Sequence, residues 1–572
     1  MENRKVAQIF QEIGDILELK GENRFRYTSY HRAAQTISNM SKDVRRIYDE
    51  NPRKLQEIPG IGAALADKIA EILNTGACQT HQRLLAEFDK GLLELLTVRG
   101  LGPKKVKKFY EELAIDDIHK LKAAAEQGVL AELEGMGEKS QTELLKAIKE
   151  HEQHRERVLL HTAMMMAEEM VDYMKKCKAV KQVEYAGSLR RGKETIGDLD
   201  ILATGKDHTK IIDHFVAHPQ VENILAQGET KASVILENVI QADLRVVDES
   251  SFGAALYYFT GSKQHNIATR KLAISKKLKI NEYGVYKGEK VVAGKTEKEI
   301  FKTLGLPYII PELREDHGEI QAGYDGTLPK ALDLKDIRGD LHMHTDESDG
   351  RHSLEEMVTQ AKALGYEYIC ICDHSTAMRV AHGLDKKRLM AQIKEIDNLN
   401  KKLRGFRVLK GIEVDIYEDG TLDFPDEILK KLDLVGAAVH SKFTLSAEKQ
   451  TARIIKAISN PYVSFLAHPT GKIIKRRDPY QVDMVEVARA AKKHNVALEI
   501  NANMRLDLDG VNARLAKEHG AKFVINTDAH RIEQMPFMRF GVTTARRGWL
   551  EKKDVLNTLP LERMLKWFGN GS

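Results

Sequence analysis

The spacing of hydrophobic residues changes twice along this 572-residue chain. Up to about residue 150, apolar positions recur at helical spacing and are interrupted by short glycine turns. From about residue 160, runs that alternate apolar and polar positions are mixed with helical ones, which is typical of a sheet with covering helices. After about residue 337, apolar runs end in polar residues and alternate with mostly helical segments, as in a parallel β/α fold. The pattern therefore predicts a helical region, an α+β region and an α/β region.

Three aspartates lie on predicted strands of the middle region. Apolar residues surround Asp198 and Asp200, whose side chains leave the same face of a strand, roughly 6–7 Å apart. Asp243 lies among the apolar residues of a second strand, 239–247, where a buried carboxylate needs a cation or hydrogen-bond donors. Such carboxylates can hold Mg²⁺ or Mn²⁺, and a pair of these ions stabilises both the attacking and the leaving oxygen in phosphoryl transfer. The alternative is a surface Asp-x-Asp pair that binds nothing.

A turn just before the first of these strands decides between the two interpretations. Gly187 and Ser188 offer backbone N–H groups and a hydroxyl, and Arg190 and Arg191 follow directly. This combination suits a triphosphate, because both N–H groups and guanidinium groups bind phosphate oxygens. The turn favours a phosphoryl-transfer site over a surface pair.

Three turns of the helical region share one pattern, with two glycines spaced two residues apart. They occupy residues 58–62, 98–102 and 133–137, and each precedes a predicted helix. Glycine allows the backbone to approach a partner closely, and the N-terminus of the next helix offers free N–H groups to a phosphate. We expect sequence-independent binding to the DNA backbone, whereas Glu134 and Glu138 favour a structural role for the third turn. The residues expected to contact DNA are Gly60, Gly62, Gly100, Gly102, Lys104 and Lys105.

The last region carries a histidine-rich set of candidate ligands. Seven predicted strands each end in a polar residue, and the ends of parallel strands are where β/α barrels carry their chemistry. One histidine alone would more often be a core or surface residue, but six at strand ends form a pattern suited to two or three Mn²⁺, Zn²⁺ or Fe²⁺ ions. A loop with Lys472, Lys475, Arg476 and Arg477 follows one of them, and either contacts a DNA backbone or is a solvated surface loop. The nine candidate ligands are His342, His344, Asp349, His374, Glu413, His440, His468, Asp528 and His530.

The composition of the chain excludes some classes of protein but does not by itself indicate a function. A net charge of +5 and a pI near 8.6 do not by themselves indicate nucleic acid binding. Four scattered cysteines exclude a disulfide framework, and Cys370 and Cys372 lie in an apolar strand pattern as buried thiols. No apolar run is long enough to span a bilayer, so we expect an intracellular, cytoplasmic protein that contacts no membrane.

These motifs together resemble a family X DNA polymerase of the polymerase beta type, over residues 1 to about 315. The resemblance implies that Asp198, Asp200 and Asp243 are the catalytic metal ligands. It also implies that Tyr258 and Phe259 exclude a ribose 2′-hydroxyl and that Arg270 meets the template strand. The nucleotide-binding set that the resemblance implies is Gly187, Ser188, Arg191, Gly197, Tyr258, Phe259, Gly261, Asn266 and Arg270.

The same resemblance places a 5′-deoxyribose-phosphate lyase nucleophile at Lys68, with Arg26 and Tyr30 in support. Lys68 follows the first glycine turn, where sequence alone would indicate a solvated lysine. The chain departs from the family pattern at Arg26, where a lysine is usual, and at Thr80, where a further lysine is expected. It also has Gln241 two residues before Asp243, where many relatives have an arginine, which leaves open how that carboxylate is oriented.

The last region resembles a polymerase and histidinol phosphatase (PHP) domain, with all nine ligand positions filled. Its expected chemistry is metal-dependent hydrolysis of phosphoesters. The expected fold is a helical helix-hairpin-helix region, a polymerase beta-like palm (nucleotidyltransferase) and a distorted (β/α)7 PHP barrel. The expected divisions are a lyase-like domain (1–85), fingers (86–160), palm (161–250), thumb (251–315), linker (316–336) and PHP domain (337–572).

The joint pattern predicts a monomeric DNA polymerase that fills short gaps in DNA repair. Its expected substrates are gapped or primer-template DNA and deoxynucleoside triphosphates. The PHP domain is expected to add a 3′–5′ exonuclease, and its relatives also suggest abasic-site endonuclease or 3′-phosphatase activity. One alternative is a small-molecule phosphatase of the histidinol-phosphate kind, fused to a nucleotidyltransferase relic. Another is a non-enzymatic DNA-binding scaffold, which would not need two complete metal sites.

Overall fold

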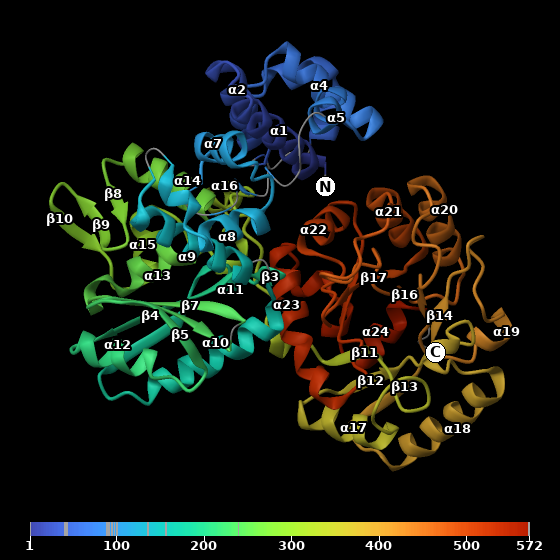
Figure 1. The fold of residues 1–572 in the computed structure, drawn as a ribbon. Helices are drawn as coiled ribbons and strands as arrows, with labels where there is room; N and C mark the ends of the chain where they lie inside the picture. Colours follow the sequence, from blue (N-terminus) through green and yellow to red (C-terminus); the bar gives the residue numbers. More distant parts are fainter. Residues whose placement is uncertain are drawn as a thin grey trace.

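The computed structural model describes residues 2–38, 40, 44–86, 92, 95, 96, 98, 101–133, 136–154, 157–237 and 239–569. Figure 1 shows the helical region above a five-stranded sheet, with the C-terminal β/α region beside the sheet. Helix α23 (Met538–Arg547) lies on the side of the C-terminal region that faces the sheet. In the described residues, no helix combines the length and the apolar character needed to cross a membrane.

The helical region is built from amphipathic helices around two separate apolar cores. Phe10, Tyr30 and Ile69 belong to the first core, and Phe109 and Leu121 to the second. Phe10 and Tyr30 pack edge to face, with 5.6 Å between ring centroids. The helices are α1 (Glu2–Leu19), α2 (Arg24–Ser38), α3 (Val44–Glu50), α4 (Ala63–Thr75), α5 (Gln79–Ala86), α7 (Pro103–Leu113), α8 (Ile118–Glu126) and α9 (Glu138–His154).

A mixed sheet of order β2-β4-β7-β6-β5 forms the middle of the chain. Burial alternates along β7, so one face of this strand is covered and the other is partly exposed, whereas β6 is buried along most of its length. A two-stranded sheet, β1 with β3, lies at one end. The elements are β1 (Val158–Leu159), α10 (Leu160–Lys175), β2 (Val180–Tyr185), α11 (Gly187–Arg190), β3 (Thr195–Ile196), β4 (Asp198–Gly205), α12 (His208–Val216), β5 (Val221–Gln227), β6 (Lys231–Leu236) and β7 (Ile240–Val246).

A smaller helix and sheet unit follows. Its elements are α13 (Phe252–Thr260), α14 (Lys263–Ser275), β8 (Lys279–Asn281), β9 (Gly284–Lys287), β10 (Lys290–Ala293) and α15 (Glu297–Thr303). The segment expected as a linker, 316–336, contains helix α16 (Glu319–Asp325) and is anchored to this unit. Glu319 Oε1 lies 2.6 Å from His265 Nδ1, and both side chains are fully buried. The segment is therefore fixed against the preceding unit by a buried hydrogen bond.

The C-terminal region contains two parallel sheets, β11-β12-β13 and β14-β15-β16-β17-β18. Isolated parallel bridges, His374–Glu413 and Met343–Ala529, join the two sheets. The strands are β11 (Gly339–Met343), β12 (Tyr368–Ile371), β13 (Arg407–Lys410), β14 (Glu413–Asp415), β15 (Gly436–Ala438), β16 (Phe465–Leu466), β17 (Ala497–Asn501) and β18 (Phe523–Asn526). Strands β13 and β14 are separated by residues 411 and 412 alone, so the described strands fill the seven predicted positions.

Helices cover these sheets on the outside. They are α17 (Leu354–Ala363), α18 (Lys386–Lys402), α19 (Asp426–Leu429), α20 (Ala447–Ile458), α21 (Met484–His494), α22 (Gly510–Glu518), α23 and α24 (Leu561–Trp567). Leu506 and Phe540 of the C-terminal region belong to the apolar core of the β2-β4-β7-β6-β5 sheet. The C-terminal region and the middle region therefore share this core. Cys370 and Cys372 are buried, as the strand pattern predicted.

Candidate active sites

The three aspartates of the middle region meet on two neighbouring strands. β4 and β7 run parallel, with Asp200 opposite Asp243 and Asp198 opposite Gln241. Alternation on β4 puts Asp198 and Asp200 on one face, as expected from their spacing. The structure thus brings together the three carboxylates that the sequence pattern selected.

The three carboxylates repel one another electrostatically, and this repulsion affects the pKa of Asp200. Burial raises the pKa of Asp200, and the charges of Asp198 and Asp243 raise it further, to about 7. Gly187 has a φ of +62°, and a Cβ there would collide with Asp200 Oδ2. Glycine is therefore required at position 187 both by its backbone conformation and by the close approach of the carboxylate.

Gln241 takes over the orientation of Asp243. Its side-chain Nε2 donates to Asp243 Oδ1 over 3.0 Å. Lys231 Nζ, from β6, lies 3.9 Å from Asp243 Oδ2. A neutral amide thus orients one oxygen and a lysine on the neighbouring strand supplies the positive charge, so an arginine at position 241 is not needed.

The glycine-serine turn forms the short helix α11 beside these carboxylates, with Ser188 as its second residue and Arg191 as its C-cap. Arg191 Nε donates to Glu315 Oε1 over 3.1 Å, and its Nη1 donates to the Thr260 carbonyl. Arg190 is used differently: it makes two hydrogen bonds to Glu297, of 2.8 and 2.7 Å. Arg190 therefore joins the turn to α15, whereas Arg191 remains beside Gly187 and Ser188. We call this turn, residues 187–192, the cradle.

The other expected nucleotide residues lie close by on α13 and α14. The rings of Tyr258 and Phe259 are 5.2 Å apart, edge to face, and Arg245 of β7 covers Phe259 at 4.6 Å. Asn266 Nδ2 donates to the Tyr258 carbonyl over 2.7 Å, and its buried Oδ1 has no hydrogen-bond partner. The remaining three are Gly261 at the end of α13, the exposed Arg270 on α14, and Gly197 just before β4, beside Arg157.

The nine histidine-rich candidates converge at one end of the parallel strands. Within the described residues, three groups could hold a metal, with ligand atoms within 4.8 Å of one another. All three lie here, and His344, His374 and Glu413 each belong to two of them. The groups are His344 with Asp349, His374 and His530, then His342 with His344 and Glu413, and then His374 with Glu413 and His440. His468 and Asp528 adjoin them, at 2.8 Å from Glu413 and 3.1 Å from His344.

Unpartnered buried atoms show that these residues suit a cation. His374 Nδ1 and Glu413 Oε2 lie 2.8 Å apart, yet neither has a hydrogen-bond partner. The same holds for His344 Nδ1, His440 Nε2 and His468 Nδ1. Buried polar atoms are normally satisfied, so imidazole and carboxylate donors left in this state fit divalent metals. In the same search of the described residues, Asp198, Asp200 and Asp243 are not among the groups within 4.8 Å.

A supporting layer around the histidines was not assigned from the sequence. Glu499 accepts from His342 over 2.8 Å, and Asp415 from His440 over 2.8 Å. Asn501 Nδ2 donates to Asp528 Oδ2 over 3.0 Å. Partners of this kind fix the ring orientation of metal-binding histidines. Asp415 stands two residues after Glu413 on β14, so strand alternation was the signal that could have found it.

The described residues of the three glycine turns share one backbone contact. Each closes with a backbone hydrogen bond between residues three apart, Ile61 to Ile58, Leu101 to Val98 and Met136 to Leu133, of 3.0, 3.1 and 2.9 Å. Gly62 and Gly102 are the N-caps of α4 and α7. Gly60 has a φ of +84° and is exposed. Lys104 and Lys105 lie in the first turn of α7, Lys105 with an exposed side chain, while Gly100 lies outside the described residues.

Lys68 lies on α4, partly buried, at a short distance from the first glycine turn. Burial raises the pKa of the Cys78 thiol, and the Lys68 charge opposes that rise, which places the two side chains near each other. Tyr30 is buried in the same core, and Arg26 pairs with Glu22 at 3.1 Å. The structure thus groups Lys68 and Tyr30 in one helical unit.

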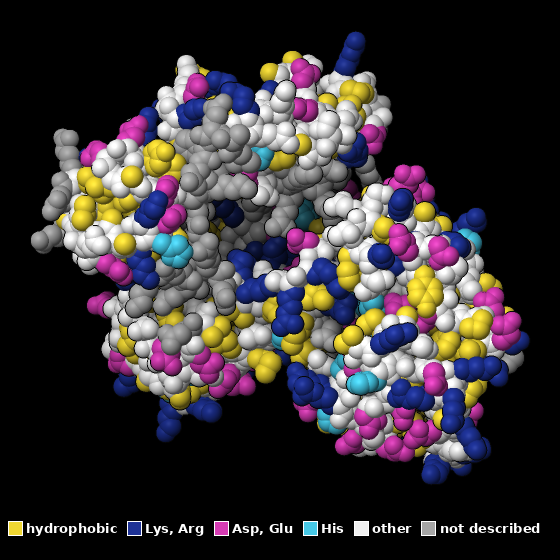
Figure 2. All heavy atoms as spheres, turned by 45° about the vertical axis from the view of Figure 1, so that its right-hand side comes forward, with side chains coloured by type: hydrophobic (Ala, Val, Ile, Leu, Met, Phe, Trp, Pro, Cys, Tyr) yellow, Lys and Arg dark blue, Asp and Glu magenta, His cyan; other side chains and the backbone are white. Residues whose placement is uncertain are grey.

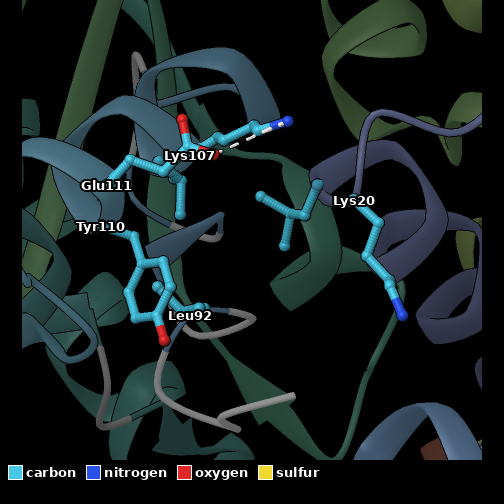
Figure 3. A pocket seen from close by; sticks show the side chains of 7 residues that line it. Lys20, Leu92, Lys107, Tyr110 and Glu111 are labelled. Atoms are coloured by element: carbon cyan, nitrogen blue, oxygen red, sulfur yellow. Dashed lines mark ion pairs between the residues drawn. The ribbon is translucent and has the colours of Figure 1, made fainter. Parts of the chain in front are cut away.

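Two further features lie outside these groups. A cavity of about 210 Å³ between α1 and α7 is lined by Leu92, Tyr110 and the Lys107–Glu111 pair among others, and by none of the carboxylate or histidine ligands (Figure 3). In the basic loop, Lys472 pairs with Glu194 at 2.7 Å and Arg477 covers the Phe443 ring at 3.9 Å. Lys475 and Arg476 remain exposed, so two of the four basic side chains of this loop make structural contacts and two face solvent.

Five family models match parts of the chain between residues 1 and 503. A helix-hairpin-helix domain matches residues 1–78, and a SAM-like helix-hairpin-helix tandem matches residues 92–150. The DNA polymerase beta palm matches residues 157–278 and the DNA polymerase beta thumb residues 255–315. A PHP domain matches residues 340–503.

Relatives fall into two kinds. The DNA polymerase/3′-5′ exonuclease PolX of Bacillus subtilis (strain 168) is 38% identical over 570 residues, which covers 98% of each chain. A probable phosphatase of Thermoanaerobacter sp. (strain X514) is 34% identical over 231 residues, which is 38% of this chain and 89% of that protein. A probable phosphatase of Acetivibrio thermocellus is 33% identical over 201 residues, covering 33% of this chain and 78% of that protein.

Proposed function

Because the chain belongs to the family X DNA polymerases that carry a C-terminal PHP domain, we propose that it fills short gaps during DNA repair. It is a DNA polymerase with a 3′–5′ exonuclease, so DNA and deoxynucleoside triphosphates are its substrates. The observation that carries the proposal is the alignment of Asp200 with Asp243 beside the Gly187–Arg190 turn. The matching families confirm the predicted helix-hairpin-helix region, polymerase beta palm and PHP domain.

Divalent metals serve both reactions: when bound, they neutralise phosphate charge and activate the attacking oxygen. In our proposal Asp198, Asp200 and Asp243 hold Mg²⁺ or Mn²⁺, while the nine histidine-rich ligands hold two or three Mn²⁺, Zn²⁺ or Fe²⁺ ions. Gln241 keeps Asp243 in place for nucleotide addition. Glu499 and Asp415 keep His342 and His440 in place for hydrolysis.

The rival phosphatase function is less well supported. Two relatives named as probable phosphatases cover only 38% and 33% of the chain, whereas the polymerase relative covers 98% of it. The intact carboxylate group and cradle would have no use in a small-molecule phosphatase. Figure 2 shows a hollow near the centre of the molecule, with Lys and Arg side chains on the described part of its wall. This positive charge suits a DNA backbone. We propose that the enzyme acts on DNA as a cytoplasmic monomer.

The gap-filling proposal predicts how the glycine turns bind DNA. A Cβ at Gly62 or Gly102 would meet nothing within 4 Å, so Gly62→Val and Gly102→Val leave the fold intact but block close approach of DNA. We expect the double variant to bind a one-nucleotide gap about tenfold more weakly, because N–H contacts to phosphate are lost. The loss should be equal on two unrelated sequences, because backbone contacts carry no base information.

Gly137→Val is the matched control, since Gly137 occupies the same position in the third turn and also has open space around it. Gly137→Val places the same bulky side chain at a helix N-terminus, so it carries the same cost in folding stability. We expect it to bind the gapped DNA as the wild type does, measured by fluorescence anisotropy. An equal loss in the control, or a loss on one sequence alone, would contradict the proposed role of the first two turns.

The lyase proposal rests on Lys68 and predicts a covalent intermediate. Borohydride should trap the protein on an incised abasic DNA end, because an amine forms a reducible Schiff base with the sugar aldehyde. Lys68→Ala should remove the adduct, seen as a shifted band on a denaturing gel, whereas Lys302→Ala in α15 should not. A full-strength adduct from Lys68→Ala would exclude this residue as the nucleophile.

A further inference from the structure

Helix α23 of the PHP domain packs directly against the triphosphate cradle of the polymerase domain. Phe540 of α23 is buried in the core beneath the five-stranded sheet, together with Leu189 of the cradle. A Cβ at Gly192, where the cradle turn ends, would collide with Thr543 of α23. The φ of Gly192 is +63°, so glycine is required there on both grounds. Figure 1 shows α23 at the edge of the PHP domain nearest α11.

Arg547, the last residue of α23, bonds to the cradle itself. Its Nη1 donates to the Arg191 carbonyl over 2.8 Å and to Glu315 Oε1 over 3.1 Å. The same Glu315 oxygen accepts from Arg191 Nε over 3.1 Å and lies 3.6 Å from Lys193 Nζ. The side chains of Arg191, Glu315 and Arg547 are 13%, 12% and 15% exposed, so water screens the group weakly.

One carboxylate thus holds three cations. Burial alone would raise the pKa of Glu315, but the charges of Arg547, Lys193 and Arg191 outweigh it and lower the pKa to about 2. Glu315 is therefore ionised at neutral pH. An ionised carboxylate beside a phosphate site opposes binding of a triphosphate unless other cations neutralise it.

We propose that Arg547 is a positioning residue for nucleotide addition, which neutralises Glu315 so that the charge of Arg191 is available to the triphosphate. The PHP domain thereby completes the nucleotide site of the polymerase domain. The inference rests on the proposed role of Arg191 in holding the nucleotide. Without Arg547, the guanidinium of Arg191 is the main partner of Glu315. When that guanidinium binds the phosphates instead, the buried carboxylate of Glu315 is left poorly compensated.

The test is steady-state gap filling by the full chain with Arg547→Gln, which removes the charge but keeps a donor for the Arg191 carbonyl. We expect KM for the nucleotide to rise about tenfold, with kcat within about twofold, since binding rather than the chemical step loses a charge. The exonuclease rate should stay unchanged. Arg546→Gln is the matched control: Arg546 bonds to Glu312 over 2.8 Å across the same interface but does not touch the cradle.

A second variant separates charge from structure. In Glu315→Gln/Arg547→Gln, the uncompensated carboxylate is gone, so KM should return toward the wild-type value, and Arg547→Lys should be close to it. The inference is wrong if Arg547→Gln leaves KM unchanged, or if Arg546→Gln and Arg547→Gln raise it equally. It is also wrong if the double variant is no better than Arg547→Gln. A wild-type KM in Arg191→Gln would instead overturn the proposed role of Arg191.

Discussion

Asp200→Asn is expected to lower the rate of nucleotide addition by about three decades, because loss of a carboxylate that would hold the metal at the reacting phosphate removes roughly 4 kcal/mol of transition-state stabilisation. Asp200 is central to the group: it lies opposite Asp243 and against Gly187 of the cradle. The substitution keeps the shape that Gly187 accommodates and removes the charge. Primer extension on a one-nucleotide gap measures the effect.

The same preparation should still shorten a primer from its 3′ end, because the histidine-rich groups lie in another domain. Asp248→Asn serves as the control, since Asp248 is an exposed aspartate just beyond β7 and should leave both activities near wild type. If Asp200→Asn lost both activities while circular dichroism showed a folded protein, the exonuclease would belong to the sheet carboxylates and the two-site assignment would be wrong.

The sequence was sufficient to predict the elements that position the polymerase site. Alternation of apolar residues placed Asp198 and Asp200 on one strand and Asp243 on another, and β4 and β7 carry them. It could not predict that β4 and β7 are parallel neighbours with Asp200 opposite Asp243. Strand pairing depends on the whole sheet rather than on either strand alone. The orientation of Asp243 by Gln241 and Lys231 likewise emerged only from the fold.

Contacts between distant segments were the part that no local pattern could reveal. Glu315 and Arg547 are separated by more than 200 positions, yet one hydrogen bond joins them. Segment 316–336 has a composition typical of a linker, but the buried His265–Glu319 pair anchors it to the preceding unit. A single buried hydrogen bond leaves no periodic signal in the sequence, because hydrophobic spacing reports only which face of an element is covered.

The exonuclease site gives the second large effect. His344→Ala should lower 3′ degradation of a primer by two to three decades, because His344 belongs to two of the three ligand groups and its loss disturbs both. Nucleotide addition should stay near wild type. Metal analysis of the purified protein gives a readout independent of activity: the variant should retain fewer bound ions, since imidazole ligands hold Mn²⁺, Zn²⁺ or Fe²⁺ through purification.

His494→Ala is the matched control, because His494 lies at the end of α21 and belongs to none of the three groups. It should keep both the exonuclease rate and the metal content. His344 is fully buried, so circular dichroism must first show that the variant is folded. A folded His344→Ala protein with full metal content and normal 3′ degradation would show that the histidine-rich groups are not the exonuclease site. Loss of nucleotide addition in the same folded variant would mean that the two sites are not independent, and the proposed contact from α23 to the cradle through Arg547 would be the first coupling to examine.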